Sequence, residues 1–145
     1  MILNFQKIRD QAIVPERATV GSAGLDLCAC LDAPVTILPG KIAMIPTGLS
    51  CAPSESDVAL MIYARSGLAC KYGIGLANGV GVVDADYRGE ICVALINQSA
   101  SEFTVTDGMR IAQLVVMPIL CPTISLVSEL PDTERGSGGF GSTGL

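Results

Sequence analysis

The sequence predicts an all-β domain with at most one short helix, built as a β-sandwich, a jelly roll or a distorted barrel. Three observations support this fold class. Short apolar runs alternate with glycine and proline along most of the chain, as in proteins made of many short strands. No long segment keeps a helical period of apolar residues. Half of the 145 residues are hydrophobic but only 4% are aromatic, so an aliphatic core is expected.

About ten strands are expected, and all of them are short. The segments that predict them are, in chain order, residues 23–30, 35–46 around a Pro39-Gly40 turn, 58–64, 79–97 around a turn near Asp84–Arg88, 102–119 around Asp107-Gly108, and 122–127. Only the segment 65–73, "RSGLACKYG", is suited to a short helix. The length of the chain fits one domain.

The last part of the chain has a different composition. Apolar residues thin out after Val127, and five of the last twelve residues are glycine. We therefore expect a single β-barrel domain over 1–127 and a flexible glycine-rich C-terminal arm over 128–145. Residues 136–141 spell G-x-G-x-x-G, but a dinucleotide site needs a strand before this pattern and a helix after it.

Composition also excludes several classes of function. The chain has no histidine, which removes histidine-dependent catalytic triads and most zinc sites. A net charge of −5 argues against binding along a nucleic-acid backbone. No apolar run is long enough for a membrane span, and the first residues lack a signal-peptide pattern. We expect a cytoplasmic protein whose six cysteines are reduced and pack as small hydrophobes.

Polar residues interrupt the strand pattern at the end of the 58–64 run. Arg65, Ser66 and Gly67 follow that strongly apolar segment directly. A guanidinium, a hydroxyl and free backbone N–H groups are the components of a phosphate cradle. Taken alone, however, the pattern fits an ordinary strand-end turn with a surface arginine even better.

Two other segments carry polar residues that strands do not need. In "NGVGVVDADYRGEI", Asp84 has apolar neighbours and could act as a general base on water, although a hairpin turn also uses aspartates. Tyr87 in the same segment could stack on a ring or a sugar. In "RIAQLVV", Arg110 and Gln113 stand three apart, so we expect them to face opposite sides of a strand, one toward a site and one toward an interface. Ordinary edge-strand polarity is the alternative there.

Taken in order, the segments "AGLDL", "ARSGLA", "NGVGVVDADYRGEI", "RIAQLVV" and "RGSGGFGSTG" resemble the five hallmark motifs of the trimeric deoxyuridine triphosphatases (dUTPases). The resemblance runs from Ala23 to Gly144. It implies a distorted jelly-roll, or β-clip, barrel that forms a homotrimer with active sites shared between subunits. It also implies hydrolysis of dUTP to dUMP and pyrophosphate with Mg²⁺, which lowers dUTP and supplies dUMP for thymidylate synthesis.

The resemblance assigns roles residue by residue. Asp84 is the expected general base, and Tyr87 would pack under the deoxyribose. The uracil edge would be read by Asn78, Gly79 and Val83. The phosphates would be held by Arg65, Ser66, Gly67 and Gln113, while Asp26 would lie near the metal through water. Arg110 is expected to be structural and to pair with an acidic residue.

The arm carries the remaining expected contacts with substrate. Phe140 would cover the uracil and Arg135 would reach the γ-phosphate, with Gly141, Ser142 and Thr143 beside it. Because ordering a glycine-rich segment costs conformational entropy, we expect the arm to close only over bound substrate.

Three alternatives remain beside this reading. A dCTP deaminase, or a bifunctional deaminase–dUTPase, shares the fold but needs a different hairpin context for its catalytic glutamate, so we interpret Glu90 as structural. A non-catalytic nucleotide-binding protein would be expected to have lost some of Asp84, Tyr87 and Phe140, which are all present. A structural jelly-roll protein would explain the strands but not the motifs.

Overall fold

The computed structural model describes residues 1–139, and these contain eleven strands and one short helix. The elements are β1 (Leu3–Lys7), β2 (Leu25–Cys28), β3 (Val35–Ile37), β4 (Ile42–Pro46), β5 (Leu49–Pro53), β6 (Val58–Ala64), α1 (Ser66–Tyr72), β7 (Ile74–Leu76), β8 (Gly81–Val83), β9 (Cys92–Asn97), β10 (Phe103–Val105) and β11 (Arg110–Pro118). The predicted all-β class is confirmed.

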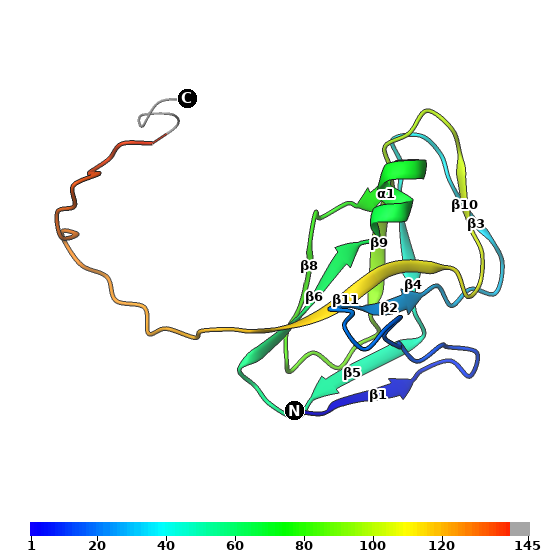
Figure 1. The fold of residues 1–145 in the computed structure, drawn as a ribbon, viewed down its shortest axis with the longest axis horizontal. Coiled ribbons are helices and arrows are strands. Elements are labelled where there is room, and N and C mark those ends of the chain that lie inside the picture. Colours follow the sequence, from blue (N-terminus) through cyan, green and yellow to red (C-terminus); the bar gives the residue numbers. More distant parts are fainter. Residues whose placement is uncertain (140–145) are drawn as a thin grey trace.

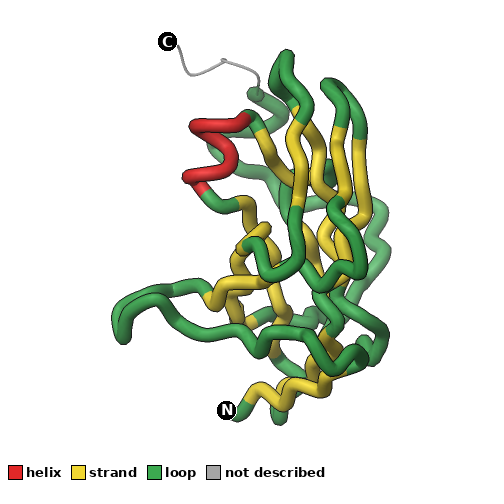
Figure 2. The backbone as a smooth tube through the Cα atoms, turned by 90° about the vertical axis from the view of Figure 1, so that its right-hand side faces the viewer, coloured by secondary structure: helices red, strands yellow, loops and turns green. Residues whose placement is uncertain are grey.

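The strands form four antiparallel groups around a main aliphatic core, and a second, small cluster consists of Ala12, Cys30 and Leu49. A four-stranded sheet has the order β2-β11-β6-β8, a three-stranded sheet has the order β4-β9-β7, and two pairs join β1 to β5 and β3 to β10. The single helix lies at the opposite end of the body from the N-terminus in both views (Figures 1 and 2). The largest fully buried side chains are all Leu, Ile or Val, as the composition predicted.

Several predicted elements occur where the sequence placed them. β6 spans Val58–Ala64, the whole of the apolar run. α1 lies inside the predicted helical segment and buries Leu68. The helix ends at Gly73, which has a φ of 66° and donates its N–H to the carbonyls of Ala69 and Leu68. This left-handed conformation is the usual reason for glycine at the end of a helix.

The segment 79–97 contains the two predicted strands, but they do not pair with each other. β8 pairs with β6, whereas β9 lies between β4 and β7 in another sheet. The residues between the strands therefore form a link between sheets rather than a narrow hairpin. We name Asp84–Glu90 the recognition turn. Period-two alternation identifies a strand but does not identify its neighbour, which is why the sequence misplaced the pairing.

The prediction of a strand over 122–127 is wrong. These residues have no regular structure in the chain, and the chain leaves the body soon after β11 ends (Figure 1). The side chains of Ile124 and Leu126 are 94% and 100% exposed. A strand needs a partner for its hydrogen bonds, and no other strand of the described residues lies beside this segment.

The cysteines mostly follow the prediction. All six are free, and Cys28, Cys30 and Cys51 are buried, whereas Cys70 and Cys121 are exposed. Burial raises the pKa of the Cys28, Cys30 and Cys51 thiols, so these groups stay protonated and pack as small hydrophobes. No helix in the described part of the chain is long and apolar enough to cross a membrane.

Three segments converge on Gly48, in the turn between β4 and β5. Its carbonyl accepts the N–H of Ile8 at 2.7 Å, and its own N–H donates to Glu90 Oε1 at 2.8 Å. Gly48 has a φ of 68°, and a Cβ there would lie 2.7 Å from Cys30 Sγ and 2.8 Å from Ala12 Cβ. Glycine is required at this position both by the backbone conformation and by the close approach of the neighbouring side chains.

Gly48→Ala is expected to lower the free energy of unfolding by about 2–5 kcal/mol, from left-handed strain and overpacking together. The matched control is Gly40→Ala, because Gly40 has a φ of 70° but no atom within 4 Å of the position that a Cβ would occupy. That control should cost only about 1–2 kcal/mol. Urea denaturation at one fixed protein concentration measures the unfolding free energy of both variants. If the two variants lost the same free energy, the packing argument would be contradicted.

Candidate active site

One carboxylate is held between two arginines at the end of the four-stranded sheet. Asp26 Oδ1 lies 3.0 Å from Arg65 Nε, and Asp26 Oδ2 lies 3.2 Å from Arg110 Nη1. Arg65 also donates to the backbone carbonyl of Arg110 at 3.3 Å. The prediction that Arg110 pairs with an acidic residue is confirmed, and that residue is Asp26.

The expectation that Arg110 and Gln113 face opposite sides of their strand is wrong. The register between β11 and β2 shifts between Arg110 and Ala112: Arg110 pairs with Cys28, and Ala112 already pairs with Leu27. This β-bulge adds one residue to β11 and reverses the alternation. Arg110 and Gln113 consequently line the same cavity.

That cavity, which we name the cradle, has a volume of about 320 Å³. Its lining is Ala18, Ser22, Ala23, Gly24, Asp26, Arg65, Ser66, Gly67, Arg110 and Gln113. Ser66 and Gly67 begin α1, and the N-cap residue of this helix makes no side-chain hydrogen bond to it, so its first N–H groups lack a capping oxygen from that residue. Cations, a hydroxyl and backbone donors thus converge, which is the chemistry that binds phosphate.

Gln113 is fixed in the cradle from two sides. Its Nε2 donates to the carbonyl of Ala64 at 3.0 Å. A Cβ on Gly24 would lie 2.6 Å from Gln113 Oε1, so the backbone of residue 24 forms one wall of the amide's site. Any side chain at residue 24 would have to displace the Gln113 amide from this position.

The recognition turn borders a second cavity of about 380 Å³, separate from the cradle. It is lined by Met44, Val82, Val83, Asp84, Tyr87, Glu90, Ile91 and Cys92. Tyr87 donates its hydroxyl to the carbonyl of Glu90 at 3.1 Å. The lining is largely apolar with two carboxylates and one phenol, which suits a flat ring or a sugar more than a phosphate.

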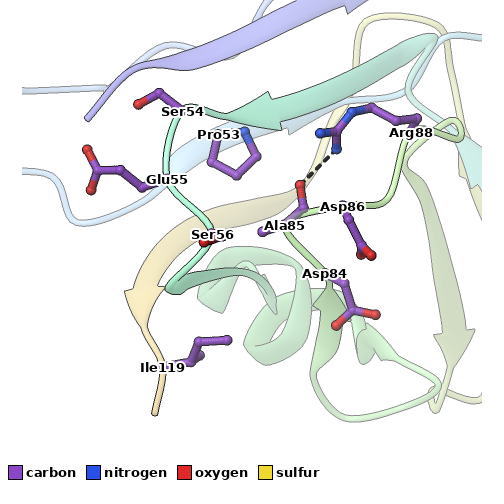
Figure 3. A pocket seen from close by; sticks show the side chains of 9 residues that line it. All are labelled: Pro53, Ser54, Glu55, Ser56, Asp84, Ala85, Asp86, Arg88 and Ile119. Atoms are coloured by element: carbon purple, nitrogen blue, oxygen red, sulfur yellow. Dashed lines mark hydrogen bonds between the residues drawn. The ribbon is translucent and has the colours of Figure 1, made fainter. Parts of the chain in front are cut away.

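Asp84 is exposed at the start of the recognition turn, and it also borders a third, polar cavity. Figure 3 shows Asp84 and Asp86 on this turn opposite Ser54, Glu55 and Ser56. Arg88 folds back to donate to the carbonyl of Ala85 at 2.8 Å. The guanidinium of the turn is thus directed to the backbone rather than to Asp84.

The structure places the other predicted residues as follows. Asn78 and Gly79 form an exposed tight turn before β8, where Gly79 has a φ of 71°. Arg135 lies in the arm, away from both cavities, and its Nε donates to the carbonyl of Gly138 at 2.9 Å. Phe140, Gly141, Ser142 and Thr143 lie outside the described residues.

A single chain therefore brings the predicted residues together in two groups. Asp26, Arg65, Ser66, Gly67 and Gln113 share the cradle, whereas Val83, Asp84 and Tyr87 share the cavity at the recognition turn. Within residues 1–139, no residue of the first group lines the second cavity, and no residue of the second group lines the cradle.

Sequence reasoning missed two residues of the cradle and its surroundings. Gly24 lies inside the segment "AGLDL", and an isolated glycine within a strand pattern is a recognised signal of close backbone approach. Arg17 donates to the carbonyls of Ser22 and Ala23 and so holds the loop before β2. Nothing in its sequence neighbourhood distinguishes Arg17 from an ordinary surface arginine.

Comparisons with known proteins show the family of this chain. Residues 10–144 match the dUTPase family. The chain is 54% identical over 132 residues to the deoxyuridine 5'-triphosphate nucleotidohydrolase of Desulfitobacterium hafniense, covering 91% of this chain and 87% of that protein. This chain belongs to the dUTPase family, and the family and enzyme class predicted from the sequence are confirmed.

Solved structures show the same fold. A variant of the Staphylococcus bacteriophage 80alpha dUTPase, determined with dUpNHpp, superposes with a TM-score of 0.89 at 25% identity and 99% coverage of both chains. A dUTPase variant from phage phi11 of S. aureus, described with a structural Mg(II) ion, superposes with a TM-score of 0.81 at 22% identity, over 91% of this chain and all of that one. The predicted jelly-roll-like barrel is confirmed.

Asp26→Asn is expected to lower the free energy of unfolding by about 1–3 kcal/mol, because two arginine ion pairs lose their anionic partner. Asp32→Asn is the matched control: its carboxylate lies 3.8 Å from Arg9 Nη1 and its side chain is 86% exposed. That substitution should cost less than about 0.5 kcal/mol. Denaturation curves at equal protein concentration compare the unfolding free energies of the two variants. Similar losses of free energy would show that the Asp26 ion pairs contribute little to stability.

Proposed function

We propose that this protein hydrolyses dUTP to dUMP and pyrophosphate. The observation that carries the proposal is the cradle, in which Arg65, Ser66, Gly67 and Gln113 converge beside the clamped Asp26. The residues of the cradle lie in the sequence segments that resemble the family's motifs, and the chain belongs to the dUTPase family. The nucleotidohydrolase name of its 54% identical relative supports the same reaction.

Asp84 is the proposed general base. Its carboxylate takes a proton from a water molecule, whose oxygen forms a bond to the α-phosphorus. The bond from the α-phosphorus to the bridging oxygen breaks, and its electron pair leaves with pyrophosphate. In a chain without histidine, the Asp84 carboxylate, which borders the second cavity, can take this role once bulk water is excluded from it.

The cradle holds the triphosphate. Arg65 supplies a guanidinium, Ser66 a hydroxyl and Gly67 an N–H, and Gln113 adds an amide. Within residues 1–139 no three acidic or cysteine side chains converge as a metal cage. The oxygen-rich donor set of Asp26, Ser66 and Gln113 nevertheless fits a hydrated Mg²⁺ that takes its direct ligands from phosphate oxygens, with Asp26 bound through water. When bound, Mg²⁺ would stabilise the charge on the departing pyrophosphate.

The recognition turn and the segment before it select the nucleoside. Tyr87 packs under the deoxyribose and leaves no room for a 2′-hydroxyl. Asn78, Gly79 and Val83 read the uracil edge through polar and backbone groups. A site built to hydrogen-bond one edge rejects a base whose donors and acceptors are exchanged, which separates uracil from cytosine.

We propose that the active form is a homotrimer in which the two cavities of different copies meet. The separation of the cradle from the Asp84 cavity within one chain supports this assembly. The exposed apolar residues Leu120, Ile124 and Leu126 support it as well, because a chain rarely leaves such a segment in water without a partner. The arm over 128–145 would then close on a neighbour's substrate, with Arg135 at the γ-phosphate, Phe140 over the base, and Gly141, Ser142 and Thr143 beside them.

One assay tests the activity. The protein is incubated with dUTP, dCTP, dTTP or UTP in the presence of Mg²⁺, and pyrophosphate and ammonia are measured separately. Pyrophosphate from dUTP, at a rate far above that from the other three nucleotides, is the expected result. Ammonia from dCTP would instead indicate a deaminase, and nucleotide binding without turnover would indicate a non-catalytic protein.

Asp84→Asn is expected to reduce kcat for dUTP by about 100-fold or more, since it removes the proton acceptor but keeps the size of the side chain. The dissociation constant for a non-hydrolysable dUTP analogue should change little, as calorimetry can measure. Asp86→Asn, on the same turn, is the matched control and should retain most of the activity. Loss of binding together with turnover in the Asp84 variant would refute its role as the base.

A further inference from the structure

The end of the recognition turn is anchored to the rest of the protein by the side chain of Glu90. Glu90 Oε1 accepts the N–H of Gly48 at 2.8 Å, and this carboxylate is only 24% exposed. The following residue is fixed too: Ile91 donates its N–H to Leu49 at 2.8 Å, and its carbonyl accepts the Thr47 hydroxyl at 2.7 Å. The end of the turn is therefore bound to the β4–β5 corner.

Tyr87 depends on the same anchor. Its hydroxyl donates to the carbonyl of Glu90 at 3.1 Å. Its ring also lies against Gly89, where a Cβ would be 2.3 Å from the hydroxyl oxygen and 2.5 Å from Cζ. The position of the tyrosine ring is thus defined by the backbone of residues 89 and 90. That backbone is held by the Glu90 side chain and by the Ile91 N–H, which belongs to the same peptide unit as the Glu90 carbonyl.

We infer that Glu90 is a positioning residue that sets the discrimination between deoxyribose and ribose. This inference rests on the proposed function, in which Tyr87 excludes the 2′-hydroxyl. Steric exclusion requires that the excluding group cannot retreat. If the Glu90–Gly48 hydrogen bond is lost, only the Ile91 N–H bond to Leu49 still holds this peptide unit. The turn before it can then shift outward, and Tyr87 shifts with it.

The acceptor oxygen of Glu90, not its charge, carries this role. The one cation of the described residues within ion-pair distance is Arg9, whose Nε lies 3.9 Å from Glu90 Oε1, beyond the length of a hydrogen bond. Arg9 also has a second carboxylate, Asp32, at 3.8 Å. The bond from Gly48 N–H is short and partly buried. A neutral acceptor of the same length should therefore replace Glu90.

The test compares Glu90→Ala with Glu90→Gln and reads the ratio of kcat/KM for dUTP to kcat/KM for UTP. The alanine variant is expected to lower this ratio about tenfold, the size expected for the loss of one hydrogen bond that holds a site. The main cause should be a gain in relative turnover of UTP. The glutamine variant should keep the ratio within about twofold of the wild type, because its Oε1 still accepts the Gly48 N–H.

Asp32→Asn is the matched control. It removes the other carboxylate beside Arg9 and leaves the Gly48 bond intact, so the ratio should not change. Thermal unfolding of every variant verifies that the protein is folded under the assay conditions.

The possible outcomes separate the inference from the proposed function. If Glu90→Ala slows dUTP and UTP hydrolysis by the same factor, the residue is merely structural and the inference is overturned. If Glu90→Gln loses discrimination as fully as the alanine variant, the role assigned to the acceptor is overturned. A wild-type protein that does not hydrolyse dUTP would refute the proposed function itself, whatever the variants do.

Discussion

The clamp on Asp26 is the interaction on which the cradle depends. Arg65 comes from the end of β6, Arg110 from the start of β11 and Asp26 from β2, which all belong to one sheet. Two guanidinium groups at one cavity repel each other, and without a shared anion both would turn toward solvent. Asp26 holds them in place and leaves one net positive charge beside the donors of Ser66 and Gly67. In the proposed function, this is how a protein with a net charge of −5 presents a local site for phosphate.

Close backbone contacts shape the cradle and fix the corner to which the recognition turn is bound. At Gly24 the main chain comes close enough to Gln113 to act as a wall, and at Gly48 it comes close enough to Cys30 and Ala12 to join three segments. A side chain in either place would force its neighbours to shift. The groups that face the cavities are therefore positioned by rigid main chain, which holds them more accurately than a flexible loop would.

Sequence patterns identified strands and helices better than they identified which strands and side chains pair with one another. β6 is apolar throughout and was located to the residue, because a buried strand needs no alternation. The β-bulge next to Arg110 was not foreseen, since Ile111 continues the apolar pattern and no glycine or proline marks the irregularity. The clamp was foreseen only as a pairing of Arg110 with some acidic residue. Its identity depends on which strands are neighbours, and alternation along one strand carries no such information.

The exposure of Asp84 in a single chain links assembly to chemistry. A carboxylate surrounded by water is a weak and poorly oriented base, and it becomes effective when bulk water is excluded and one water molecule is held against it. No described element of its own chain covers Asp84, which borders two open cavities. If the cradle of a second copy closes over the recognition turn, as proposed, the same contact delivers the α-phosphate and removes the surrounding water. Association would then create the reactive carboxylate, so isolated chains should hold the residues of catalysis without the environment that makes them work.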